Sequence, residues 1–290
     1  MNDLKNNSLK IAVIGGMNMD ILGKSYAPYV QGDSLPGSIF HRPGGVARNI
    51  AAFLRNLGVE VELVCALGND HIADQLKTAC FKLGIGLTYA IQTDYPSPTY
   101  LAIHDDAGEV VCAINDMRAM EEMTPASLSA HLEALNMFDA CVLDANLSTE
   151  ALAYLAESLH IPLIADPVSA VKSKRLLPIL DKLTALKPNL MEAQALAGEQ
   201  EMRQSADCLL KAGVKQIFIS LGRDGVYYTD GKDCGRIGTK LFPGTTKTGA
   251  GDAMTAGIAL AIAQGSSVKM TAQKGIYAST CFLESENSTI

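Results

Sequence analysis

TKTGAGDAMTAGIALAI, residues 246–262, sets Gly249, Ala250 and Gly251 directly before Asp252 and an apolar, helix-forming run. The first N–H groups of a helix have no partner within the helix, and the helix dipole adds partial positive charge there. Because these three residues carry almost no side chain, phosphate oxygens can approach the backbone closely. Asp252 would repel a phosphate, but it can accept the proton of an alcohol that receives a phosphoryl group. The stretch predicts an anion hole with Asp252 as general base; a glycine-rich turn with Asp252 as a plain N-cap is an equally good interpretation.

Short β-branched segments alternate with helical patterns along the chain, which predicts an α/β fold with a mainly parallel sheet. The expected strands are residues 10–15, 61–67, 140–144, 162–166, 183–186 and 216–222. Between the first two, VARNIAAFLRNLG (46–58) has apolar residues at helical spacing, and its Gly58 is typical of the residue that ends a helix.

Two regions break this alternation: the Gly/Pro-rich residues 21–42, and residues 95–114, which resemble a hairpin with DDAG as its turn. We expect both to form a small β lid, and residues 1–20, 43–94 and 115–290 to form the α/β core. A lid suits an enzyme that must keep water from a reactive group.

Polar residues follow several of the expected strands. They are Asn18 with Asp20, Asp144 with Asn146, Asp166, and Asn189 with Glu192. Because the carboxyl ends of parallel strands meet at one edge of a sheet, where ligands bind, we expect these side chains to lie together. Each residue alone is typical of a helix cap or turn, but the repetition favours a site.

Two further segments suit a nucleotide. Asn189 and Glu192 lie three residues apart at an expected helix start and could hold Mg²⁺ through water, with Asp166 near the same ion; a capping pair is the alternative. Ser220, Gly222 and Gly225 end the sixth expected strand and suit a backbone that passes close to ATP, although a simple β-turn explains them equally well. Lys187 could touch a phosphate, but a solvated loop lysine is the favoured interpretation.

Composition excludes several classes of protein. With 48% hydrophobic residues in 290 the chain can bury a core, and its net charge of −7 argues against nucleic acid or an anionic membrane as partner. Seven cysteines without CxxC spacing indicate reduced thiols, and no signal-peptide pattern is found. The longest apolar helical run, residues 253–263, is shorter than the roughly 20 residues of a membrane span. We expect a cytoplasmic protein.

PGGVARNIA (43–51), TGAGDAMTAG (248–257) and the Asn189–Glu192 pair together resemble the PfkB, or ribokinase-like, carbohydrate kinases over essentially the whole chain. The resemblance implies a ribokinase-like three-layer fold with a β lid, transfer of phosphate from ATP to a sugar or nucleoside, Mg²⁺, an effect of K⁺, and a homodimer formed through the lid. Under the resemblance, the substrate contacts would be Asn18, Asp20, Gly44, Gly45 and Asn49. The ATP contacts would be Asn189, Ser220, Gly222, Gly225, Thr248, Gly275 and Ser279.

Connecting segments such as AINDM (113–117) and DPVSA (166–170) are similar to the pseudouridine kinase branch of the family, which implies transfer to the 5′-hydroxyl of pseudouridine. Pseudouridine has one more ring N–H than uridine, so its recognition needs one more acceptor. We expect Asn115 or Asp116 to read the base, with Ser97 and Thr99; a strand-terminating turn is the alternative. A ribokinase, adenosine kinase or fructokinase type of activity, or a sensor without catalysis, stays open. Family members usually continue beyond ENSTI (286–290), so an incomplete adenine or K⁺ site, or a truncated chain, is expected.

Overall fold

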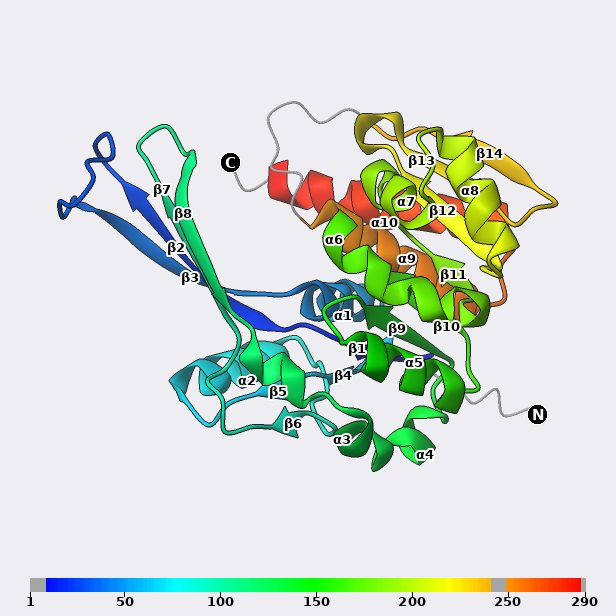
Figure 1. Ribbon diagram of the computed structural model, residues 1–290, viewed down its shortest axis with the longest axis horizontal. Coiled ribbons are helices and arrows are strands. Elements are labelled where there is room, and N and C mark those ends of the chain that lie inside the picture. Colours follow the sequence, from blue (N-terminus) through cyan, green and yellow to red (C-terminus); the bar gives the residue numbers. More distant parts are fainter. Residues whose placement is uncertain (1–8, 241–248, 288–290) are drawn as a thin grey trace, which may run out of the picture.

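An eight-stranded sheet runs through the core of the molecule, with helices on both faces (Figure 1). The computed structural model describes residues 9–240 and 249–287. In spatial order the strands are β14 (Cys234–Ile237), β13 (Val226–Thr229), β12 (Gln216–Ser220), β11 (Ala185–Leu186), β10 (Leu163–Asp166), β9 (Ala140–Asp144), β1 (Lys10–Ile14) and β4 (Glu60–Val64). The run from β12 to β4 is parallel, and β13 and β14 add an antiparallel edge.

Both faces of this sheet are buried, as is usual for parallel strands. Every residue of β9 and β10 is buried, and successive residues of β1 enter two different cores, with Ile11 and Val13 in one and Ala12 and Ile14 in the other. The three-layer arrangement follows from this, because each face needs its own cover of helices.

Four helices pack in the core that contains Ile11: α1 (Val46–Asn56), α2 (His71–Lys82), α9 (Ala250–Ala263) and α10 (Val268–Asn287). The core that contains Ala12 is covered by η1 (Arg118–Glu122), α3 (Pro125–Ser129), α4 (Leu132–Leu135), α5 (Thr149–Ser158), η2 (Lys174–Lys182), α7 (Leu190–Ala197) and α8 (Met202–Lys211). Two short elements, α6 (Ala170–Ser173) and η3 (Gly222–Asp224), lie in loops. The helix expected within residues 46–58 is present as α1, and Gly58 follows its C-cap residue with φ +81°.

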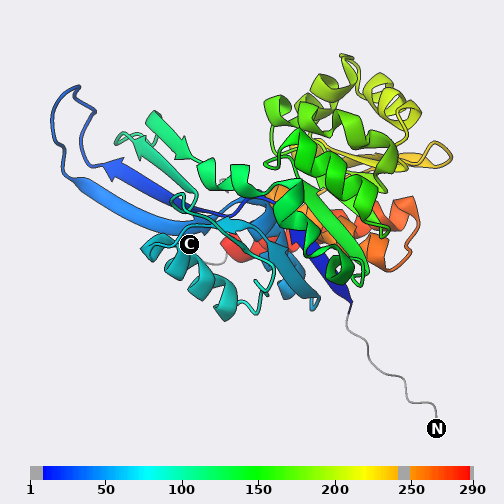
Figure 2. The same ribbon diagram turned by 60° about the horizontal axis from the view of Figure 1, so that its bottom comes forward.

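A second, four-stranded sheet projects from the core in both views (Figures 1 and 2). Its strands, in spatial order, are β3 (Gly37–Gly44), β2 (Asn18–Ser25), β7 (Thr99–His104) and β8 (Val110–Asp116). A small parallel pair, β5 (Ala66–Leu67) and β6 (Ile91–Gln92), completes the strands that the described residues form. We call the four-stranded sheet the lid sheet.

Within the described residues, no helix combines the length and the apolar character needed to cross a membrane.

Candidate active site

The carboxyl ends of the central strands bring the polar residues of the sequence together at one edge. The strand order reverses at β1, which lies between β4 and β9, and such a switch is where open α/β sheets bind ligands. Asp144 ends β9 and Asp166 ends β10, and the two are register partners. Lys187 follows β11 directly, so two carboxylates and one ammonium group line this edge.

Asp144 anchors the backbone around the switch. Its carboxylate accepts hydrogen bonds from the backbone N–H groups of Gly16 and Ala47, both at 3.0 Å, and of Asn146 at 2.9 Å. Burial raises the pKa of Asp144, and the hydrogen bonds from Gly16 and Asn146 oppose the rise. A Cβ atom on Gly15 would lie 2.3 Å from this carboxyl group, which explains the glycine there. Asp144 therefore holds the start of α1 against β9.

At the base of the lid sheet, Asp20 lies beside the glycine pair of the first motif. The Asn18 side-chain amide donates to Asp20 at 2.7 Å, and Arg42 lies 3.6 Å away as an ion-pair partner. A Cβ atom on Gly44 would come within 2.5 Å of an Asp20 oxygen. Gly45 is the N-cap of α1 with φ +99°, and a Cβ atom there would meet the backbone of residue 16 at 2.4 Å. Both glycines are thus required by close approach.

Helix α9 begins within the TGAGD motif, and its N-cap residue, Gly249, has no side chain that could accept a hydrogen bond from the first N–H groups. Gly249 is its N-cap with φ +98°, in the left-handed region that favours glycine. Ala250, Gly251 and Asp252 form the first turn, whose N–H groups have no acceptor within the helix. This is the geometry of an anion-binding helix terminus.

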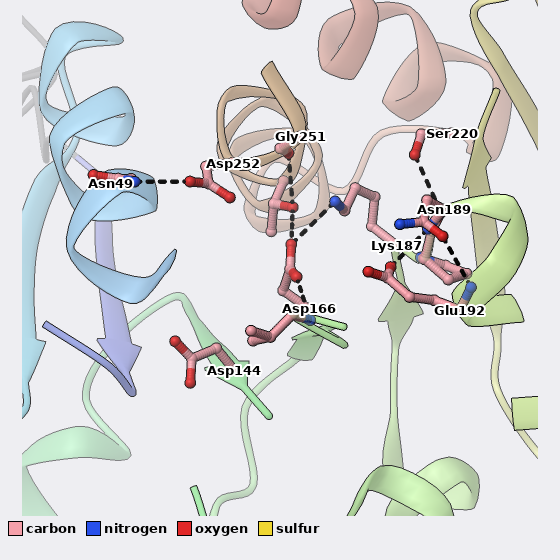
Figure 3. A network of polar contacts seen from close by, with 12 residues as sticks. Asn49, Asp144, Asp166, Lys187, Asn189, Glu192, Ser220, Gly251 and Asp252 are labelled. Atoms are coloured by element: carbon pink, nitrogen blue, oxygen red, sulfur yellow. Dashed lines mark hydrogen bonds and ion pairs between the residues drawn. The ribbon is translucent and has the colours of Figure 1, made fainter. Parts of the chain in front are cut away.

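The half-buried carboxylate of Asp252 accepts a hydrogen bond from the side-chain amide of Asn49, at 2.9 Å (Figure 3). The two glycine motifs, about 200 residues apart, therefore meet through one side-chain contact. Burial and the nearby Asp166 and Asp144 carboxylates raise the pKa of Asp252 to about 7, while Asn49 and Lys187 lower it. A carboxyl group with such a pKa is suited to accept a proton near neutral pH.

Lys187 is buried and ion-paired, whereas the sequence favoured a solvated loop lysine. Its ammonium group lies 3.1 Å from Asp166, and both side chains are about 95% buried, at 6% and 5% exposed. Burial lowers the pKa of Lys187, but Asp166, Glu192 and Asp252 outweigh this effect, so the pKa is raised. A Cβ atom on Gly251 would lie 3.2 Å from the Lys187 nitrogen. A fixed positive charge therefore lies beside the first turn of α9.

Asp166 is fully engaged by the protein. Besides Lys187, it accepts hydrogen bonds from the Thr255 hydroxyl at 2.8 Å and from the Val168 N–H at 2.9 Å. Thr255 belongs to α9, so Asp166 also ties this helix to β10. Direct coordination of a metal ion by Asp166 would have to compete with these three donors.

Asn189 and Glu192 form a capping box at the start of α7, which is the alternative interpretation of their spacing. The backbone N–H of Asn189 donates to Glu192 at 2.8 Å, and that of Glu192 donates to the Asn189 side chain at 2.9 Å. Burial raises the pKa of Glu192, which the Asn189 bond opposes. Among the described residues no group of three His, Cys, Asp or Glu side chains is arranged to hold a metal ion. The donor set fits a hydrated ion better than one bound directly, because Mg²⁺ keeps much of its water.

The residues expected to contact ATP are spread over three places. Ser220 pairs with Asn189 in an isolated parallel bridge, and Gly222 and Gly225 follow with φ +60° and +86°. On α10, Ser279 is buried, while Gly275 lies where a Cβ atom would come within 3.0 Å of Ile258 on α9. The structure thus places Gly275 in helix packing, where the sequence suggested a purine wall. Thr248 lies outside the described residues.

The residues expected to read a base have different surroundings. Ser97 is buried, and its hydroxyl donates to Asp70, the N-cap of α2, at 2.7 Å. Thr99 donates to the Ser97 carbonyl at 3.1 Å. Asp116 is held by Arg118 through two contacts of 2.6 and 2.9 Å, which lower the pKa of Asp116 to about 2. Asn115 is exposed on β8. Ser97 and Asp116 are therefore occupied by partners within the chain.

Comparison with known proteins defines the class of this enzyme. The pfkB family of carbohydrate kinases matches residues 8–290, and the chain belongs to that family. It is 35% identical to pseudouridine kinase of Escherichia coli strain K12 over 86% of this chain and 82% of that protein. It is 28% identical to ribokinase of Bacillus subtilis strain 168 over 89% and 87% of the two chains.

Solved structures agree with this assignment. A carbohydrate kinase from Agrobacterium tumefaciens superposes with a TM-score of 0.84 and 30% identity, covering 93% of this chain and 89% of that one. The ribokinase of Thermotoga maritima superposes with a TM-score of 0.83 and 25% identity, over 93% and 90%. The fold is ribokinase-like, and the chain is an ATP-dependent kinase of the PfkB family. Kinases of this family generally use ATP with a divalent metal ion.

Proposed function

We propose that this kinase transfers the γ-phosphoryl group of ATP to the 5′-hydroxyl of pseudouridine, giving pseudouridine 5′-phosphate. The relative at 35% identity is a pseudouridine kinase, whereas a ribokinase is matched at 28%. The observation in the structure that carries the proposal is one row of residues across the lid sheet.

That row is Asp20 on β2, Tyr100 on β7 and Asn115 on β8, which are register partners of one another. Register partners point to the same face of a sheet, and neighbouring strands lie about 4.8 Å apart. Asp20 and Asn115 are therefore separated by about two strand spacings, roughly 10 Å, with an aromatic ring between them. This spacing suits a nucleoside whose ribose hydroxyls bind Asp20 while its base lies against Tyr100.

Of the two residues expected to recognise the base, Asn115 is better placed than Asp116. Asp116 and Thr99 lie in the neighbouring row, so they point to the opposite face of the lid sheet from Asp20. The amide oxygen of Asn115 can accept the extra ring N–H that distinguishes pseudouridine from uridine. The kcat/KM ratio for pseudouridine over uridine should fall in Asn115→Ala and stay unchanged in Asp116→Ala, which is the matched control.

The proposed mechanism uses the residues at the two helix starts. Asp252 takes the proton of the 5′-hydroxyl as its oxygen forms a bond to the γ-phosphorus, and the bond to the bridging oxygen breaks to release ADP. The N–H groups at the start of α9 and the Lys187 ammonium stabilise the charge on the transferred group. Glu192 and Asn189 would hold Mg²⁺ through water, and this ion neutralises phosphate charge when it is bound. Asn18, Gly44, Gly45 and Asn49 line the sugar side, and Ser220, Gly222 and Gly225 the ATP side.

We propose a homodimer in which a second copy covers the outer face of the lid sheet. Ile39, Leu101, Ile103 and Ile114 share the face opposite Asp20, and they are between 37% and 72% exposed. Apolar patches of this kind mark protein interfaces. Ile114→Lys should shift the chain from dimer to monomer in analytical ultracentrifugation, whereas Val171→Lys, at an exposed site on α6, should not. A monomeric unmodified protein would contradict the proposal.

Cytoplasmic location is part of the same proposal, because the reaction needs ATP and the seven cysteines are unpaired, as in a reducing compartment.

The deciding experiment for the substrate is an ATP-consumption panel with pseudouridine, uridine, adenosine, ribose and fructose, with and without K⁺. Preferred turnover of pseudouridine is expected. Exclusive turnover of ribose or a hexose would replace the substrate and keep the kinase, and no turnover of any acceptor would favour a sensor.

A further inference from the structure

A chain of two side-chain hydrogen bonds leads from Arg48 to Asp252. Arg48 donates to the amide oxygen of Asn49 at 3.3 Å and to the carbonyl of Pro43 at 3.4 Å. The amide nitrogen of Asn49 donates in turn to Asp252 at 2.9 Å (Figure 3). Arg48 and Asn49 both belong to the first turns of α1, and Asp252 to the first turn of α9.

The amide of Asn49 can satisfy both neighbours in only one orientation. It has one acceptor oxygen and two N–H donors. With the amide reversed, its oxygen would face the Asp252 carboxylate and its NH₂ group would face the Arg48 guanidinium, so both contacts would become repulsive. In the observed orientation one N–H serves Asp252, and the second is left for a substrate hydroxyl.

We propose that Arg48 is a positioning residue that acts through Asn49 on the catalytic base. It fixes the Asn49 amide so that one carboxylate oxygen of Asp252 is held and the other is left for the acceptor alcohol. This inference rests on the proposed role of Asp252 as base.

The surroundings of Arg48 differ from those of an arginine that only stabilises the fold. Arg55, on the same helix, donates to the carbonyls of Leu83 at 3.2 Å and Val59 at 2.7 Å. The Nε atom of Arg48, in contrast, is buried and has no hydrogen-bond partner among the residues that the structure describes. Burial lowers the pKa of Arg48, and Arg42 adds to this effect, whereas Cys80 and Asp20 oppose it. A partly buried cation with a buried, unsatisfied donor is costly for stability alone, which favours a role in the site.

Several groups around Asp252 set the pKa of its carboxyl group, so loss of the Arg48–Asn49 hydrogen bond can be detected through this pKa. Asp166 on β10 and Asp144 on β9 raise its pKa, together with burial, and Lys187 after β11 lowers it. Asn49 is the hydrogen-bond donor that lowers this pKa. When the Asn49 amide is no longer held, the pH at which kcat/KM rises should therefore move upward, which a general loss of stability would not cause.

The test compares Arg48→Met, Asn49→Ala, the double variant and Arg55→Met as the matched control. Arg48→Met should lower kcat/KM for the acceptor by about 10- to 100-fold, the range for losing a hydrogen bond to a charged group. Its pH profile should shift upward while KM for ATP stays the same. Arg48→Lys should recover part of the activity, and Arg55→Met should lower thermal stability without moving the profile.

The double variant separates action through Asn49 from an independent effect. If Arg48 works through Asn49, Arg48→Met should cost nothing further once Asn49→Ala is present. Full additivity, or an unshifted pH profile in folded Arg48→Met and Arg48→Lys, would overturn the inference. Near-normal turnover in Asp252→Asn would instead show that the base assignment is wrong, so the two failures are distinguishable.

Discussion

Replacing Lys187 by Met should lower the free energy of unfolding far more than replacing a surface lysine by Met. The ammonium of Lys187 lies 3.1 Å from Asp166 in a site where both side chains are almost fully buried. Removing one partner of a buried pair leaves an uncompensated charge and typically costs about 3–5 kcal/mol. Lys182 provides the matched control, since its contact with Asp181 is 3.8 Å long between half-exposed side chains and should be worth at most about 1 kcal/mol.

The assay is urea unfolding at pH 7, with the free energies of unfolding of both variants compared with the unmodified chain. Adding Asp166→Asn to Lys187→Met should restore part of the loss, because it removes the carboxylate left without a partner. Equal costs for Lys187→Met and Lys182→Met would refute the view that this ammonium is held in a desolvated pair. The surviving activity of Lys187→Met should also rise at higher pH than in the unmodified enzyme, because Lys187 lowers the pKa of Asp252.

Three further outcomes are expected. In the unmodified enzyme kcat/KM should rise with pH through about 7, where Asp252 ionises, and a flat pH–rate profile across that region would contradict its role as base. The raised pKa also means that the ionised carboxylate destabilises the folded state as pH rises from 3.8 to about 7. Asp252→Asn should therefore unfold at a higher temperature than the unmodified chain at pH 8, a gain that disappears near pH 4, while its kcat falls by about 10²–10⁴-fold. Gly249→Ala should lower the free energy of unfolding by about 1–2 kcal/mol through backbone strain. It should also crowd Phe282, whose ring would lie 3.0 Å from the new Cβ atom. Gly198→Ala, at a left-handed helix cap with open space around it, measures the strain alone in the same unfolding assay.

The fold follows from sequence because its signals are local. Parallel strands buried on both faces give continuous apolar runs, and the helices between them show their own spacing. The antiparallel edge is harder to predict: β13 and β14 are four residues each, and the β-turn expected after residue 220 gave no sign of a second strand beyond it. Strand β11 has only two residues, yet it still places Lys187 at the carboxyl edge.

The site is only partly predictable, because its contacts depend on tertiary packing. The proximity of Asp144 and Asp166 follows from the meeting of the carboxyl ends of parallel strands at one edge of the sheet, which the sequence predicts. The bond between Asn49 and Asp252 depends on how α1 and α9 pack together, and nothing local encodes that distance. The expectation of a solvated Lys187 is wrong because this lysine directly follows a buried strand, which places its ammonium group against Asp166.

Glycine at a helix start illustrates why a motif must be read with its neighbours. Helices α2, α5 and α7 are capped by the side chains of Asp70, Ser148 and Asn189, each of which accepts a hydrogen bond from one N–H group of the first turn. Helix α9 begins at Gly249, which has no side chain to cap it, although a capping side chain would add about 1 kcal/mol of stability. Helix α1 begins at Gly45 in the same way, but there the Asp144 carboxylate accepts the N–H of Ala47. A capping oxygen at residue 249 would compete with an incoming anion for the N–H groups at the start of α9. Helices α1 and α9 are joined to each other by the Asn49–Asp252 bond, so the start of α9 lies beside the carboxylate proposed to activate the acceptor.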